Sequence, residues 1–462
     1  MLPSAQFDAD LIQRYGLNGP RYTSYPTAVS FHEGFDETAY RANAARSNED
    51  FIPKPLSLYV HLPFCHSLCY YCACNKKITR HARHGDDYLH WLDREIALQG
   101  ALFDRDREVA QLHFGGGTPT FFDDDQLERV MASLGEAFTL SADEDREYSI
   151  EIDPRTVDPA RLERLAGLGL NRLSLGVQDL DPEVQAAVNR VQGAEETLGL
   201  IEAARAVGFG SVSLDLIYGL PLQTLDSFRH TLDVIVEARP DRLSIYNYAH
   251  LPDLFRAQRL IREEDLPTPA TRLALLQCTI DRLRDAGYVY IGMDHFALPD
   301  NELVRARENG QLQRNFQGYS TYADCDLVGL GVSAIGKVGD SYVQNRKDIR
   351  DWRRSLQAGA LPVWRGIQLG WEDRLRRTVI EQIMCHGRLD FEGLGAAHGI
   401  DFDEHFAPEL ETLRALEADG LVTLDDGMLS VTPAGMLLVR AVAMVFDEFL
   451  QRQQGRAFSK VV

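Results

Sequence analysis

Four of the seven cysteines in the chain fall within the stretch CHSLCYYCACN, residues 65–75. A disulfide fits poorly there, because cysteines so close in a short loop cannot easily reach one another. A structural zinc site normally takes ligands from a second Cys or His pair further along, but the other three cysteines are isolated at positions 278, 325 and 385. An iron–sulfur cluster is the interpretation that remains.

Cys65, Cys69 and Cys72 supply three thiolate ligands for such a cluster. A cubane has four irons, so one iron stays open to a non-protein ligand unless Cys74 reaches it. Cys74 is separated from Cys72 by one residue, and we doubt that two thiols so close in the loop bind the same cubane. A small buried hydrophobe is an equally open role for Cys74. An open iron indicates chemistry rather than electron storage.

The chain is too long for one ordinary core, since 462 residues predict a large domain with smaller attachments. Its 69 acidic against 48 basic residues give a net charge of −21, which argues against nucleic acid as a partner. The longest apolar stretch, MLLVRAVAMVF, carries a charge and is too short for a membrane span. The N-terminus lacks a basic start and an apolar core, so we expect a cytoplasmic protein.

Alternating and apolar runs predict six strands, separated by segments of helical periodicity such as 86–102, 123–138 and 224–238. The six strands are expected at 56–63, 109–114, 148–153, 172–177, 212–219 and 242–248. Strands that alternate with helices pair in parallel. We therefore predict an α/β fold with a partial (β/α)6 barrel.

Polar or glycine-rich residues follow each predicted strand, at the edge where such barrels carry their chemistry. The first strand runs into the cysteines and the second into GGGTP, residues 115–119, where a backbone without side chains can approach a ligand closely. A triple glycine is also an ordinary tight turn, and a polar residue at a strand end is often only a cap. The later strand ends carry Glu151, Gln178, Asp215 and Asn247.

The spacing Cys-x3-Cys-x2-Cys resembles the radical S-adenosylmethionine (SAM) superfamily, in which SAM binds the open iron and is cleaved to a 5′-deoxyadenosyl radical. The likeness extends along the chain to the family of oxygen-independent coproporphyrinogen III oxidases. It rests on GPRYTSYPT (19–27), YVHLPFCHSLCYYCACNK (59–76), LHFGGGTPT (112–120), IEIDPR (150–155), DLIYGLP (215–221), YNYAHLP (246–252), IGMDHFA (291–297), NFQGY (315–319) and GLGVSAI (329–335).

This resemblance implies that two propionates of coproporphyrinogen III become vinyl groups with loss of carbon dioxide, giving protoporphyrinogen IX for haem synthesis without oxygen. It also implies a [4Fe-4S] cluster and two SAM molecules. Contacts of the SAM on the cluster carry over to Tyr59, Gly116, Glu151 and Ile335. Contacts of the second SAM carry over to Tyr71, Gly117, Thr118, Gln178, Arg190, Asp215 and Ala249, with Tyr71 standing where the family usually has phenylalanine.

The family further implies a low-potential electron donor protein such as a flavodoxin, and a monomer. It keeps a cysteine at the position of Cys74 without using it as a ligand. We expect an N-terminal arm at 1–55, the barrel with extensions at 56–365, and a mainly helical, winged-helix-like domain at 366–462.

The resemblance leaves some roles and alternatives open. His295 is a candidate proton donor or a core histidine, and Arg21 a candidate propionate ligand or a structural arginine. A haem chaperone of the same superfamily is the alternative function, although such relatives typically lack both the cysteine at position 74 and the arm. A radical SAM enzyme of different chemistry is a third hypothesis, which the residues of GMDHFA and NFQGY disfavour.

Overall fold

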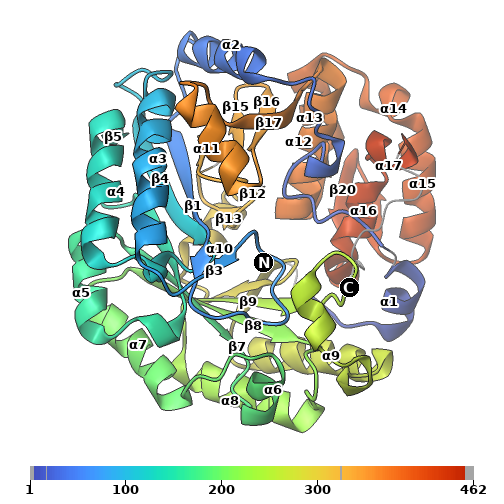
Figure 1. Ribbon diagram of the computed structural model, residues 1–462. Helices are drawn as coiled ribbons and strands as arrows, with labels where there is room; N and C mark the ends of the chain where they lie inside the picture. The colour runs from blue at the N-terminus through green and yellow to red at the C-terminus, as the bar shows by residue number, and fades with distance from the viewer. Residues whose placement is uncertain (1–4, 17, 323–324, 453–462) are drawn as a thin grey trace. The chain divides into compact units, whose positions relative to one another are not determined.

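The computed structural model describes residues 5–16, 18–322 and 325–452, and six of its strands form a parallel sheet (Figure 1). Every neighbouring pair among the six is parallel. In sheet order they are β1 (Leu56–Leu62), β4 (Glu108–Gly116), β6 (Glu147–Ile152), β7 (Arg172–Gln178), β8 (Ser211–Tyr218) and β9 (Arg242–Asn247). The predicted partial (β/α)6 barrel is therefore confirmed, and each strand lies where its sequence pattern indicated.

Burial along the strands follows their place in the sheet. In β7 buried and half-buried side chains alternate, as expected for a strand with one face toward the core. Strand β1 is buried at every position except Tyr59, because β4 pairs with one of its edges and β14 (Asp326–Leu330) with the other. Tyr59 is thus the one residue of β1 that is not fully enclosed.

Helices connect the parallel strands, and Figure 1 shows α3, α4, α5, α7 and α8 on the outer side of the sheet. Local signals start two of them: Asp123 and Gln126 form a capping box at α4, and Thr224 and Ser227 form one at α8. The connecting helices are α3 (Arg83–Gly100), α4 (Asp124–Ala137), α5 (Pro159–Gly167), α6 (Pro182–Ala187), α7 (Ala194–Ala206) and α8 (Leu225–Ala238).

Beyond β14, three antiparallel strands extend the sheet, and the sequence patterns did not predict them. They are β15 (Ile335–Val338), β16 (Ser341–Asn345) and β17 (Val363–Gln368), with α11 (Ile349–Gln357) between the last two. Helix α2 (Glu37–Asn48) precedes β1 in the chain, and the two-residue strand β5 (Thr139–Leu140) pairs with β4.

The fully buried carboxylate of Glu95 ties α3 to this extension. It accepts hydrogen bonds from the Gly331 backbone amide (2.9 Å), the Asn345 side-chain amide (2.7 Å) and the Trp352 indole (2.8 Å). Burial raises the pKa of Glu95 to about 7, and the three donors oppose that rise. All three donors depend on this one side chain, so a buried acid fixes the segment that leads to Ile335.

The chain folds as two compact units. One, the barrel unit, comprises Phe31–Thr268 and Asp324–Gln368, and the other comprises Met1–Ser30, Pro269–Ala323 and Leu369–Val462. In the second unit Tyr22 donates a hydrogen bond to Asp447 (2.9 Å), so the N-terminal arm contacts the last part of the chain. The first elements of this unit are α1 (Ala9–Tyr15), α9 (Pro269–Asp285), β10 (Val289–Gly292), β11 (His295–Ala297), α10 (Glu302–Glu308), β12 (Gln313–Asn315) and β13 (Gly318–Ser320).

The C-terminal region has the mainly helical content predicted for it. Its elements are α12 (Trp371–His386), β18 (Arg388–Asp390), α13 (Phe391–His398), α14 (Phe402–His405), α15 (Ala407–Ala418), β19 (Val422–Asp425), β20 (Met428–Val431), α16 (Val439–Met444) and α17 (Glu448–Arg452). The three strands form a small antiparallel sheet in the order β18-β20-β19. Helices followed by a strand hairpin are the order of a winged helix, and the domain limits drawn from the sequence stay a prediction.

Among the residues that the structure describes, none forms a helix that is both long enough and apolar enough to cross a bilayer.

Candidate active site

The cysteine-rich loop is closed at its base by a two-residue sheet. Strand β2 (Phe64–Cys65) pairs in parallel with β3 (Lys77–Ile78), with Cys65 opposite Ile78. The Lys77 amide donates to the Pro63 carbonyl (2.7 Å), and the Thr79 amide donates to the Cys65 carbonyl (3.0 Å). The thiols therefore lie on a ring of chain that begins directly after β1.

Three hydrogen bonds hold the outer part of this ring on the barrel. The Tyr70 amide donates to the Val188 carbonyl (3.0 Å), and the Asn189 side chain donates to the Leu68 carbonyl (2.7 Å). The Gln258 side-chain amide donates to the Tyr71 carbonyl (3.1 Å). The loop is thus positioned by residues that follow β7 and β9, far from it in sequence.

Each predicted ligand has its own surroundings. Thr118 donates from its hydroxyl to the Cys65 sulfur (3.5 Å), and Lys76 donates from its ammonium to the Cys72 carbonyl (2.8 Å). Cys69 is buried, whereas Cys74 is exposed. None of the seven cysteines, all of which lie in the described part of the chain, forms a disulfide.

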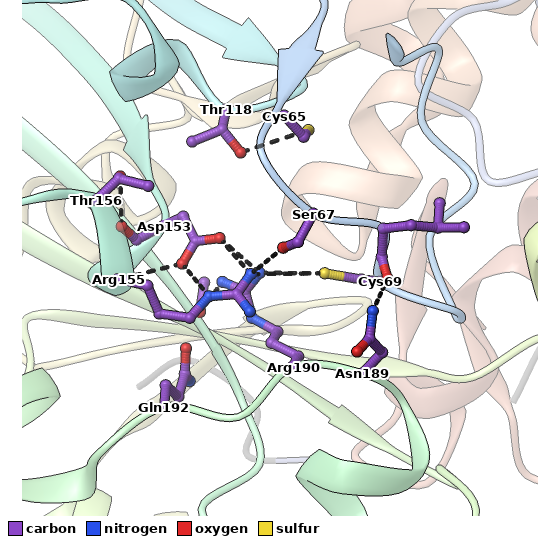
Figure 2. Close-up of polar contacts among 12 residues, drawn as sticks. Cys65, Ser67, Cys69, Thr118, Asp153, Arg155, Thr156, Asn189, Arg190 and Gln192 are labelled. Atoms are coloured by element: carbon purple, nitrogen blue, oxygen red, sulfur yellow. Dashed lines mark hydrogen bonds and ion pairs between the residues drawn. The ribbon is translucent and has the colours of Figure 1, made fainter. Parts of the chain in front are cut away.

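Two arginines converge on the Cys69 sulfur, as Figure 2 shows. Arg190 donates to it at 3.5 Å and Arg155 at 3.9 Å. Between them Asp153 accepts two hydrogen bonds from the Arg155 guanidinium (2.7 and 2.9 Å) and one from Arg190 (3.1 Å). Burial alone would raise the pKa of Asp153, but hydrogen bonds from Arg155 and the charge of Arg190 lower it. The three groups therefore place a net positive charge beside a cysteine.

The donors around Cys69 fit a cluster that is held by thiolates. In the part of the chain that the structure describes, no three His, Cys, Asp or Glu side chains converge on one point where an ion could sit. A cluster is wider than an ion, and its thiolate ligands carry negative charge that N–H donors stabilise. Arg190 is 7% exposed, and its Nε has no hydrogen-bond partner among the described residues, so it can still donate to a ligand.

The three glycines of GGGTP are required by close packing. A Cβ on Gly115 would lie 2.8 Å from the Glu151 carboxylate, and one on Gly117 would lie 2.8 Å from the Phe64 carbonyl oxygen. Gly116 has a φ of +116°, and its Cβ would lie 2.7 Å from the His61 ring. That ring hydrogen-bonds to the Asn75 carbonyl at the end of the cysteine loop (2.9 Å). The turn therefore packs directly on the side chain that supports the loop.

Gly116→Ala is expected to weaken both stability and SAM cleavage, because the new methyl group would displace His61 and the backbone would be strained. Strain and overpacking together cost on the order of 3 kcal/mol. The thermal midpoint and the rate of 5′-deoxyadenosine formation measure the two effects. Gly167→Ala is the matched control, since nothing lies within 4 Å of its Cβ position at the end of α5. Equal behaviour of the two variants would contradict the packing argument.

Glu151, near the end of β6, is held as a carboxylate whose side chain remains partly exposed. His113 hydrogen-bonds to one of its oxygens (3.0 Å), and the Gly116 amide donates to the other (3.2 Å). Burial would raise the pKa of Glu151, but the hydrogen bond and charge of His113 outweigh it, so the pKa is lowered. Its side chain is 43% exposed, which leaves the carboxylate accessible to hydrogen-bond donors of a ligand.

Asp215 on β8 is the opposite case. Burial raises its pKa to about 7, and the negative charge of Glu151 adds to the rise. Ser174 donates to it at 3.3 Å. Two strand-end carboxyls predicted from the sequence therefore affect one another, with Glu151 the stronger acid of the pair.

The other predicted contacts fall into smaller groups at the same sheet edge. Tyr59 stacks on His113, with 5.8 Å between the ring centroids. Gln178 has a φ of +69° at a bulge between β7 and β8, and the Gly176 carbonyl of that bulge accepts a hydrogen bond from Arg190 (2.5 Å). Gln258 donates to the Ala249 carbonyl (3.2 Å) as well as to Tyr71, so one amide joins these two positions.

No contact with the cysteine loop is described for three further candidates, Ile335, Arg21 and His295. Ile335 begins β15, and a Cβ on Gly329 would lie 2.9 Å from its carbonyl carbon. In the second unit, the Arg21 guanidinium forms an ion pair with Asp294. Next to it in sequence, the His295 ring packs edge-on against Tyr319, 5.2 Å between centroids. Their roles stay as predicted alternatives.

The sequence patterns missed four residues that build the site: His113, Asp153, Arg155 and Gln258. Asp153 and Arg155 follow the β6 strand directly, so the rule that strand ends carry function could have found them. His113 lies on β4, two positions before Gly115, so the two residues are on the same face of the strand. Gln258 lies in a short 3-10 helix, Arg256–Leu260, and no sequence signal marks it.

Comparisons with known proteins agree with this geometry. The model of the Radical SAM superfamily matches residues 59–235, and that of the HemN C-terminal domain matches residues 371–438. The oxygen-independent coproporphyrinogen III oxidase of Pseudomonas aeruginosa is 51% identical over 100% of both chains. The Escherichia coli protein of that name is 48% identical over 99% of this chain and 98% of its own.

Among solved structures, that of coproporphyrinogen III oxidase (HemN) from Escherichia coli, described as a radical SAM enzyme, superposes with a TM-score of 0.91. It is 46% identical, and the match covers 96% of this chain and 100% of the other. The likeness therefore spans both units, including the strands that the sequence patterns did not predict.

Proposed function

The chain belongs to the oxygen-independent coproporphyrinogen III oxidases of the radical SAM superfamily, and we propose on that premise that it oxidatively decarboxylates coproporphyrinogen III. The product is protoporphyrinogen IX, a precursor of haem. One observation carries the proposal at the level of chemistry. A closed loop with three thiols meets the glycine turn and the Glu151 carboxylate at the carboxyl edge of a parallel barrel.

The reaction needs no protein nucleophile. For each of two propionates, a hydrogen atom leaves the β-carbon, the bond to the carboxylate breaks with release of carbon dioxide, and one electron passes to an acceptor. A vinyl group remains. The protein must therefore hold the propionate near the radical source and keep other hydrogen donors away.

Cys65, Cys69 and Cys72 would hold a [4Fe-4S] cluster through their thiolates. When bound, the cluster supplies the electron that cleaves SAM, and SAM supplies the 5′-deoxyadenosyl radical. Tyr59, Gly116, Glu151 and Ile335 would contact this SAM. The ionised carboxylate of Glu151, with 43% of its side chain exposed, suits the ribose hydroxyls or the amine of SAM, which donate hydrogen bonds.

A second SAM is proposed to bind Tyr71, Gly117, Thr118, Gln178, Arg190, Asp215 and Ala249. Two features of the structure support placing these residues at one site. Gln258 joins Tyr71 to Ala249, and Arg190 has a buried Nε that can donate to a carboxylate. Asp215 can act as an acceptor for ribose hydroxyls.

We propose further that the protein works in the cytoplasm as a monomer and takes electrons from a low-potential carrier such as a flavodoxin. Seven cysteines without a disulfide suit a reducing compartment. The haem biosynthetic role follows from the substrate.

The experiment that tests the function uses anaerobically reconstituted protein with SAM, a strong reductant, coproporphyrinogen III and an electron acceptor. 5′-Deoxyadenosine and porphyrin products are quantified together by chromatography. Protoporphyrin in step with 5′-deoxyadenosine is the expected result. 5′-Deoxyadenosine without protoporphyrin would assign another substrate, and tight haem binding without 5′-deoxyadenosine would assign a haem carrier.

A further inference from the structure

A short run of positive charge directly follows the cysteine loop. The stretch KKITRHARH, residues 76–84, has two lysines, two arginines and two histidines and no acid, in a chain whose net charge is −21. It includes β3 and ends in the first turn of α3. A cluster of one sign in an otherwise acidic protein creates a local positive potential.

The outer side chains of this run are exposed and unneutralised. Lys77, Arg80 and Arg83 are all exposed, and within the described part of the chain none of them forms an ion pair with an acid. Burial, and then the charges of Lys77, His81 and Arg83, lower the pKa of His84. Asp87 acts in the opposite direction on His84, but Lys77, Arg80 and Arg83 form no ion pair among the described residues, which leaves them available to a partner.

The run is fixed in place close to a cluster ligand. Ile78 lies opposite Cys65 in the β2–β3 pair, and the Thr79 amide donates to the Cys65 carbonyl (3.0 Å). The Thr79 hydroxyl hydrogen-bonds to His84 (2.8 Å) and accepts from the His81 amide (3.2 Å), so the run folds around one side chain. A molecule bound to this surface would lie next to the backbone of Cys65.

One further cation, Lys347, lies in a segment that contacts the end of the loop. Asn75 donates from its side chain to the Lys347 carbonyl (3.1 Å), and Lys347 itself is exposed. Burial, and then the nearby charge of Arg365, lower the pKa of Lys347. The segment between β16 and α11 thus adds one cation, Lys347, which is followed directly by the exposed acid Asp348.

An apolar side chain lies within this surface. Ile78 is 40% exposed, between Lys77 and Thr79. Protein interfaces typically combine a small apolar centre with a charged or polar rim, and the rim sets the rate of association. The run has both parts.

We propose that residues 77–84, with Ile78 within the surface, are the docking surface for an acidic one-electron carrier protein. The proposal rests on the proposed function, because only a radical SAM enzyme needs an electron at this loop. The carrier is oxidised by one electron and the cluster held by Cys65, Cys69 and Cys72 is reduced by one. No bond forms or breaks at the surface.

A nucleic acid or a substrate with several carboxylates could also bind a positive surface, but neither fits this one. A nucleic acid needs a longer track of cations on its phosphates, and the rest of the chain is strongly acidic. A substrate with several carboxylates needs buried or bidentate cations, whereas these side chains are exposed and unpaired. Neither would require the contact between this run and Cys65.

The test uses the reconstituted holoenzyme with Lys77→Glu, Arg80→Glu and Arg83→Glu combined, and a reduced flavodoxin as the probe. Cluster reduction is followed by rapid mixing and absorbance. Affinity is measured separately with oxidised flavodoxin, which needs no turnover. Reduction is expected to slow by about 10-fold or more at low salt, with the difference disappearing at high salt, and affinity is expected to fall in parallel.

Two controls separate docking from damage. The triple variant Arg129→Glu, Arg164→Glu, Arg229→Glu makes the same change in net charge on α4, α5 and α8, and should react with flavodoxin as the unaltered protein does. Formation of 5′-deoxyadenosine with dithionite, which needs no docking, should be unchanged in both variants. If the first variant loses iron, Arg80→Gln with Arg83→Gln leaves β3 intact and replaces it.

The outcomes are distinct. An unchanged flavodoxin rate and affinity would overturn the docking surface while leaving the function intact. A raised KM for coproporphyrinogen III with dithionite would assign the surface to substrate, and loss of RNA binding alone would assign it to nucleic acid; either result overturns the proposal. Failure of the proposed function looks different, since the unaltered protein would then form no protoporphyrin with dithionite.

Discussion

The Cys69→Ala protein is expected to bind no stable cubane cluster and to form 5′-deoxyadenosine only at background level. Cys69 is one of three proposed protein ligands, so its loss leaves two thiolates for four irons. It also removes the sulfur on which Arg155 and Arg190 converge and leaves these cations without that acceptor. Iron and sulfide content, cluster absorbance and 5′-deoxyadenosine formation measure the result.

Cys74→Ala is the matched control, because it removes a thiol from the same loop. Cys74 is exposed and lies two residues beyond Cys72. The variant is expected to retain the cluster and to cleave SAM. A Cys69→Ala protein with full iron content, or a Cys74→Ala protein without iron, would show that the ligand assignment is wrong.

Arg190→Ala should abolish decarboxylation while some uncoupled SAM cleavage survives. The guanidinium is almost fully buried, and its hydrogen bonds link Cys69, Asp153 and the Gly176 carbonyl. Removing it leaves the cluster ligands in place but disturbs the proposed second SAM site. Misplacement of reacting groups by about 1 Å lowers turnover on the order of 100-fold. Protoporphyrin and 5′-deoxyadenosine are measured together to give their ratio.

Stability must be measured alongside, since the loss of one partner of a buried ion pair can cost ~3–5 kcal/mol. Arg155 still pairs with Asp153 in the variant, so we expect the lower end of that range. Arg190→Lys keeps the charge but cannot reach three acceptors with a planar fork, and it should fold normally yet remain impaired. Full activity of Arg190→Ala would refute a role in the second SAM site.

The barrel could be predicted because its strands carry their own signals. Each of the six has alternating or continuous apolar residues and ends in polar or glycine-rich sequence, and each is present. Strands β14 to β17 were not predicted, since they are short and β14 and β16 are buried at every position, so that no alternation remains to be read. What holds them is long-range: Glu95 on α3 receives hydrogen bonds from three separate parts of the extension.

The candidate site divides in the same way. Cysteine spacing indicated Cys65, and the ends of predicted strands indicated Glu151 and Asp215. These signals are local, because they lie within a few residues of each position. His113 and Gln258 act by contact with residues distant in sequence, Glu151 and Tyr71 respectively. Such partners depend on which strands are neighbours in the sheet, and periodicity alone does not contain that information.

The discontinuous make-up of the two units sets an order in which they can form during synthesis. The parallel strands of the barrel unit are complete once β14 has been made, because β14 pairs with the second edge of β1. The contacts of Arg14 and Tyr22 in the arm can form only later. Tyr22 and its partner Asp447 are 425 positions apart, and Arg14 and Asp419 are 405 apart.

Closing such long loops costs chain entropy before any contact is gained, so these pairs form late. Domains that are complete earlier fold first as the chain emerges from the ribosome. The part of the N-terminal arm before Phe31 is thus synthesised first and is among the last to reach its native contacts. A ribosome-bound chain that ends before residue 447 would contain a complete barrel sheet and an arm whose Tyr22 partner does not yet exist.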